Sequence, residues 1–191
     1  MATVTSVTRE YQGRTVPEAA TYVLDPSHTA VEFVGRHLMI TKVRGRFTSF
    51  AGQINIADVP EESSVEVTID VGSVDSSDEK RDGHLLSPDF FDVERWPTIT
   101  FRSTRVEPGK RGAWIVTGDL TVKGVTRPVV LDVEFDGAQA TPWGDQRLGF
   151  SASTEIDRED WGLTWNQALE TGGFLVGKRV RIELNVEAQR Q

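Results

Sequence analysis

The histidines are the first residues to consider for chemistry, because the chain contains no cysteine. His28, His37 and His84 lie far apart in the sequence, and no two of them have the short spacing typical of metal ligands. Each therefore has a plain interpretation, a hydrogen bond to a backbone group or acid near a barrel end. A more specific interpretation is that His37 or His84 contacts the polar head group of a ligand.

The segment from Gly172 to Lys178 matches most of a phosphate-binding loop. Arg179 stands where that loop needs a serine or threonine, and the residues after it alternate as in a strand. Since the loop works only at the start of a helix, a turn is the better interpretation. Residues 149–153, GFSAS, likewise lack the last glycine of a nucleophile elbow.

Acidic residues occur beside His84 and around Trp161 and could be taken for acid–base pairs. They are Asp82, Glu155, Asp157, Glu159 and Asp160. Nothing in the sequence brings them to a common point, and charged rims of barrels usually face solvent. We therefore predict that the protein is not an enzyme and has neither a catalytic residue, a metal nor another cofactor.

The stretch from Asp82 to Phe101 is the element around which the chain is organised. It concentrates bulky side chains between charged ones: Leu85, Leu86, Phe90, Phe91, Trp96 and Phe101. Such residues are costly to leave in water, so the stretch should plug, rim or floor a cavity. Phe90 and Phe91 are adjacent, and on an extended chain they would point in opposite directions. One should pack inward, and the other should either close the barrel end as a lid or meet a partner.

The rest of the chain consists of short alternating strands. They are expected at 22–25, 31–35, 38–50, 53–57, 64–71, 98–106, 113–120, 129–135, 148–156 and 178–188. Ser76 and Glu79 fit a capping box, which predicts a short helix to about Leu86. Many strands without a βαβ rhythm favour an all-β fold, a single antiparallel barrel of about eight strands with one or two short helices.

Composition limits the partners. The 191 residues favour one domain, at 21–191, with residues 1–20 as a flexible N-terminal extension. The net charge of −8 argues against nucleic acid or an anionic membrane surface as the main partner, while it leaves room for local basic spots. No run approaches the length of a spanning helix, so stable membrane insertion is not expected, and no signal peptide is seen, which predicts a cytoplasmic protein.

Five blocks of this sequence resemble the YceI-like family. They are YVLDPSHTAVEFVGRH, VRGRFTSFAGQI, RDGHLLSPDFFDVERWPTITFRST, GDLTVKGVTRPVVL and GFSASTEIDREDWGL with GGFLVGKRVRIEL, in family order over residues 22–188. The resemblance implies a lipocalin-like barrel with a long apolar channel. It also implies a polyisoprenoid, isoprenoid quinone or similar lipid chain as the ligand.

Small residues within strands, Gly118, Gly149 and Ala152, would leave room for such a ligand. An interior filled by side chains, in a barrel that serves as a protein-interaction module, is the alternative. Trp161 and Trp165 could form a portal or a plug. The predicted ligand-binding residues are Phe33, His37, Val65, Val67, Ile69, His84, Phe90, Phe91, Trp96, Phe101, Val133, Phe150, Trp161, Trp165 and Ile182. The sequence is also compatible with a homodimer.

Overall fold

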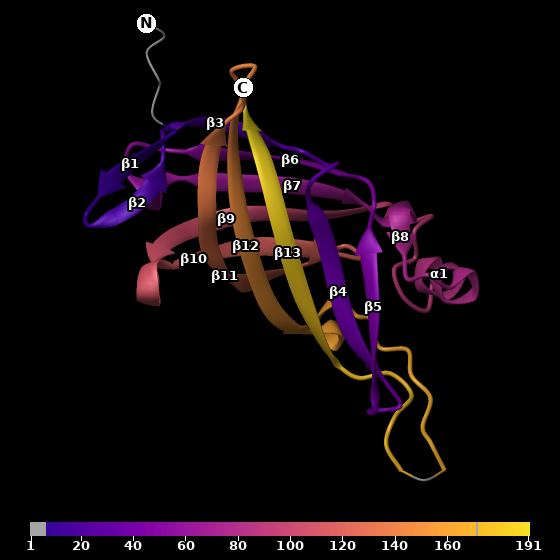
Figure 1. Cartoon of the computed structure of the whole chain (residues 1–191). Coiled ribbons are helices and arrows are strands. Elements are labelled where there is room, and N and C mark those ends of the chain that lie inside the picture. Colours follow the sequence, from indigo (N-terminus) through magenta and orange to yellow (C-terminus); the bar gives the residue numbers. More distant parts are fainter. Residues whose placement is uncertain (1–6, 171) are drawn as a thin grey trace, which may run out of the picture.

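Eight antiparallel strands form a closed barrel in the computed structural model, which describes residues 7–170 and 172–191 (Figure 1). Their order around the barrel is β12-β11-β10-β9-β7-β6-β3-β13, and pairing of β13 with β12 closes it. The strands are β3 (Ala20–Leu24), β6 (Phe50–Ile56), β7 (Ser64–Asp70), β9 (Thr98–Pro108), β10 (Trp114–Val122), β11 (Val125–Ala140), β12 (Gln146–Asp157) and β13 (Arg179–Arg190). The predicted fold class is confirmed.

A second set of strands extends the wall at one end of the barrel. β13 pairs with β3 through residues 188–190 and with β4 (Ala30–His37) through residues 181–185. β4 pairs with β5 (Thr41–Phe47), and β5 pairs with the short β8 (Val74–Asp75). The β4–β5 hairpin and the loop between β12 and β13 project at this same end (Figure 1).

The single α-helix, within the described ranges, is α1 (Glu79–Leu86). Asp78 caps it, since its carboxylate accepts a hydrogen bond of 3.0 Å from the backbone N–H of Arg81. The capping box predicted at Ser76 is therefore wrong, and the Ser76 hydroxyl instead donates to the Asp82 carboxylate. No helix in the described ranges has both the length and the apolar character needed to cross a membrane.

An N-terminal hairpin covers one end of the sheet. β1 (Thr8–Tyr11) pairs with β2 (Arg14–Pro17), and Val16 in β2 is fully buried. The Arg14 guanidinium donates to the carbonyls of Gly109 and Ala113 at 2.8 and 2.9 Å and lies over the Trp114 ring. Residues 8–17 of the expected N-terminal extension therefore form this hairpin, while residues 1–6 lie outside the described ranges.

Candidate ligand-binding cavity

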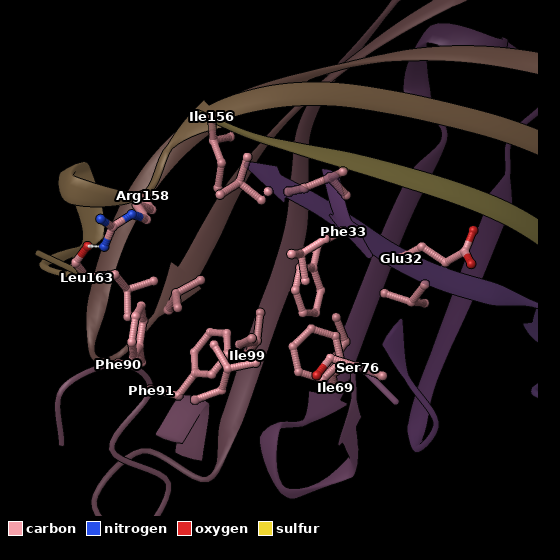
Figure 2. A pocket seen from close by; sticks show the side chains of 18 of the residues that line it. Glu32, Phe33, Ile69, Ser76, Phe90, Phe91, Ile99, Ile156, Arg158 and Leu163 are labelled. Carbon is pink, nitrogen blue, oxygen red and sulfur yellow. Dashed lines mark hydrogen bonds between the residues drawn. The ribbon is translucent and has the colours of Figure 1, made fainter. Parts of the chain in front are cut away.

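The barrel encloses a cavity of about 580 Å³, within the range of small-molecule sites. Inward-facing side chains of the strands form its walls, and α1 with the turn after it forms one side. Figure 2 shows the rings of Phe33, Phe90 and Phe91 among the side chains around it. Apolar groups dominate the lining, so the cavity favours an apolar ligand.

Ten of the fifteen predicted ligand-binding residues line this cavity. They are Phe33, His37, Val67, Ile69, His84, Phe90, Phe91, Phe101, Trp165 and Ile182. They come from four strands, α1, the turn that follows it and the loop after β12. The alternation of apolar residues in the strands is the sequence signal that placed the strand residues among them.

Three predicted residues do not line the cavity: Val65, Val133 and Phe150. The prediction that they line one continuous channel is therefore wrong. Each lies one or two inward positions further along a strand whose nearer inward residues do line it, so all three lie where the cavity ends and the other half of the barrel begins. Phe150 packs there on Phe135, with ring centroids 5.3 Å apart. That half is filled by buried side chains, among them Tyr22, Trp114, Val116, Leu148 and Ala188. The barrel is thus solid in one half and hollow in the other.

The two other predicted residues that do not line the cavity are tryptophans. Trp161 is buried in the core, and its indole N–H donates to the Leu120 carbonyl at 3.0 Å, so it acts as a plug and not as a portal. Trp96 covers the tight turn at Gly124, where an added Cβ would lie 2.5 Å from its ring. It is not part of the cavity lining.

Phe90 and Phe91 both line the cavity, which contradicts their expected opposite directions. The chain here is a series of turns, with Phe90 N–H bonded to the Ser87 carbonyl and Phe91 N–H bonded to the Leu85 carbonyl. Strand alternation does not apply to such a segment. Phe90 packs against Trp165 at 5.5 Å between centroids, and Phe91 packs edge-on against Phe47 at 5.9 Å.

His37 and His84 line the cavity, whereas His28 does not. His84 places Nε2 3.0 Å from the Asp89 carboxylate and packs its ring edge-on against Trp165, with centroids 4.5 Å apart. This geometry positions an imidazole beside an acid. His84 can therefore offer a hydrogen bond to a polar group in the cavity.

His28 belongs to a polar cluster at another place in the barrel, with Asp25, Glu187 and Arg147. One potential ligand atom each from Asp25, His28 and Glu187 lies within 4.8 Å of the others. The Arg147 guanidinium bonds both carboxylates, so the cluster already contains a cation. Hydrogen bonds to Asp25 from Ser27, His28 and Arg147 hold the pKa of its carboxyl well below the ordinary value.

Arg158 is a charged residue of the cavity lining that the sequence did not indicate. Only 4% of it is exposed, and its guanidinium donates to the carbonyls of Leu163 and Gly177. Figure 2 shows the bond to Leu163. It also lies over the Phe90 ring, 5.8 Å from the centroid. Burial lowers the pKa of this guanidinium. No ion pair to it is found in the described residues, and nothing in the sequence around it marks it as buried.

A closed antiparallel barrel, solid in one half and hollow with apolar walls in the other, defines a lipocalin-like binding barrel. The YceI-like domain family matches residues 22–188. The chain therefore belongs to the YceI-like family, as the five sequence blocks predicted.

Individual relatives agree with this assignment. The UPF0312 protein SA2479 of Staphylococcus aureus (strain N315) is 38% identical over 169 residues, which cover 87% of this chain and 95% of the relative. The solved structure of BcnA from Burkholderia cenocepacia has a TM-score of 0.75 at 24% identity, covering 86% of this chain and 98% of BcnA. A polyisoprenoid binding domain from Saccharophagus degradans has a TM-score of 0.68 at 16% identity, covering 91% of this chain and 100% of that domain. At these identities the two structures show the fold alone.

Proposed function

We propose that the protein binds and carries or stores a long apolar chain, of polyisoprenoid type, in the hollow half of the barrel, and that it performs no chemistry on it. The cavity of about 580 Å³ with apolar walls is the observation that carries this proposal. The similarity in fold to a polyisoprenoid binding domain supports the same class of ligand.

The energetics favour a chain over a small polar molecule. Burying one CH₂ group contributes about 0.8 kcal/mol, so a five-carbon isoprene unit contributes about 4 kcal/mol before the costs of ordering it. The solid half closes one end of the cavity, so affinity should rise with chain length until the hollow half is filled. His84 and His37 offer the polar contacts for a head group.

The alternative, a filled barrel that serves only as an interaction module, explains the half of the barrel around Tyr22 and Leu148. It does not explain the hollow half, because an empty cavity of this size lowers the free energy of unfolding. We therefore favour a binding protein.

The test is organic extraction of the purified protein followed by mass spectrometry, together with uptake of a labelled prenyl chain by stripped protein. We expect a bound chain, and we expect Val67→Trp, which fills the cavity, to weaken uptake. Val130→Trp is the matched control, since Val130 is exposed on the outer face of β11. An empty extract together with no uptake by the stripped wild type would refute the proposal.

The absence of chemistry has its own test. The double variant His37→Ala, His84→Ala should change only affinity, by about 0.5–3 kcal/mol if a head-group hydrogen bond is lost, and the recovered chain should have the same mass. A product that the wild type forms and this variant does not would show that the protein is an enzyme.

A further inference from the structure

A cluster of exposed apolar side chains lies at the end of the molecule where the β4–β5 hairpin projects. Leu38, Met39 and Ile40 form the hairpin turn, and Phe174 lies in the neighbouring loop between β12 and β13. Ile40 is 78% exposed and Met39 is 56% exposed. We refer to these four residues as the apolar tip. Large apolar side chains gathered on a projecting turn indicate a contact surface.

The backbone holds the two parts of the apolar tip together. The N–H of Leu38 donates to the Leu175 carbonyl at 2.8 Å, and His37 forms a β-bridge with Val176. Leu38 and Met39 also have φ values of 53° and 60°, a region that favours glycine or asparagine in hairpin turns. Apolar residues at such positions are disfavoured by local conformation, which favours a role for the side chains themselves.

Basic residues border the apolar tip. The groove beside it is lined by six basic side chains and three acidic ones (Glu155, Asp157 and Glu183). Lys178 is also paired with a fourth acid, Glu159, so the basic residues outnumber the acidic ones by two in a protein of net charge −8. The basic residues are Arg36, Lys42, Arg44, Lys178, Arg179 and Arg181. A local cationic surface of this kind attracts anions even when the whole protein is acidic.

The ligand cavity begins next to the apolar tip. His37 and Leu175, which adjoin Leu38 and Phe174 in the sequence, both line the cavity. A surface that held the apolar tip would therefore lie close to the cavity as well.

We propose that the apolar tip and its basic border dock on the surface of an anionic lipid bilayer. Apolar side chains that enter the interface and cations that contact the head groups are the two contributions that bind peripheral proteins to such bilayers. The projecting shape of the tip fits insertion better than it fits a flat interface with another protein, which needs a much larger buried area. The docking itself does not depend on which cargo the cavity holds.

The experiment is co-sedimentation of the full chain with vesicles of phosphatidylcholine, with or without phosphatidylglycerol. We expect binding to the anionic vesicles that weakens as salt is added. Met39→Ser with Ile40→Ser should weaken binding at least about 30-fold, because two apolar side chains no longer enter the interface. Lys42→Gln with Arg179→Gln should weaken it about 30-fold.

Trp143→Ser is the matched control. Trp143 is 76% exposed in the turn between β11 and β12, away from the tip, and its loss should leave vesicle binding unchanged. Cargo content is measured on every variant, and the tip variants should keep it, which separates failed docking from a failed cavity. No binding to anionic vesicles, binding that the tip substitutions leave unchanged, or a tip substitution that only dissociates a dimer would each overturn the proposal.

Discussion

Gly45 is the position where one methyl group should change the cavity most. It lies opposite Phe33 in the β4–β5 pair, and a Cβ added there would be 2.2 Å from the end of the Phe33 ring. Carbon atoms in contact lie about 3.5–4.0 Å apart, so in Gly45→Ala the ring must move by more than about 1 Å. The adjoining cavity is the open direction, so we expect the ring to move into it.

The expected result has two parts. Crowding should lower the free energy of unfolding by about 1–3 kcal/mol. Alanine also reduces the conformational entropy of the unfolded chain, which should return about 0.4–1 kcal/mol. Affinity for a prenyl chain should fall about tenfold, because the displaced ring occupies the volume of roughly two CH₂ groups. Urea unfolding and binding of a labelled prenyl chain measure the two effects.

Gly35 provides the matched control, since it also lines the cavity but an added Cβ would meet nothing within 4 Å. Gly35→Ala should therefore stabilise the protein by about 0.4–1 kcal/mol. In a Phe33→Leu variant the ring is absent, so Gly45→Ala should lower the free energy of unfolding much less than it does in the wild type. The reasoning fails if both glycine variants behave alike, or if the Phe33 background leaves the cost of Gly45→Ala unchanged.

Three further predictions concern stability. Arg158→Met should cost about 2–5 kcal/mol in urea unfolding, because it leaves the buried carbonyls of Leu163 and Gly177 without a donor, and a loss under about 1 kcal/mol would contradict this. Since the folded pKa of Asp25 lies below its unfolded value of about 3.9, its stabilisation is complete above that pH and is lost as pH falls; unfolding of Asp25→Asn should depend less on pH in that acid range. Val16→Ala should cost about 1–3 kcal/mol by thermal unfolding, whereas no loss would show that the N-terminal hairpin adds nothing to the fold.

The barrel could be predicted because its strands alternate with a period of two over many residues. In β11, for example, Val129, Leu131 and Val133 share one face, and that face is the interior. The same alternation cannot tell the hollow half from the solid half, since inward-facing aliphatic residues occur in both. Leu131 lines the cavity and Val133 does not, although both continue the same alternation.

Other misses have local causes. The strands of the N-terminal hairpin have four residues each, too few for a period to be visible. Opposite directions for Phe90 and Phe91 follow only from an extended chain, and hydrogen bonds to Ser87 and Leu85 make the segment a turn. Arg158 lies in an acidic stretch that resembles a solvated rim, and only the backbone carbonyls around it make its burial tolerable.

The glycines explain in part why the cavity is open. The sequence predicts room for a ligand at Gly118, yet an added Cβ there would lie 2.4 Å from the Phe101 ring, so the ring uses that space. Phe33 uses the space over Gly45 in the same way. An aromatic ring that packs on a glycine lies close to the barrel wall and leaves the centre of the cavity free. Over a larger residue the same ring would be pushed toward that centre. A barrel of eight strands is at the size where side chains can either fill the interior or leave room for one ligand. Glycine beneath phenylalanine, as at Gly45 and Gly118, favours the open state of that balance.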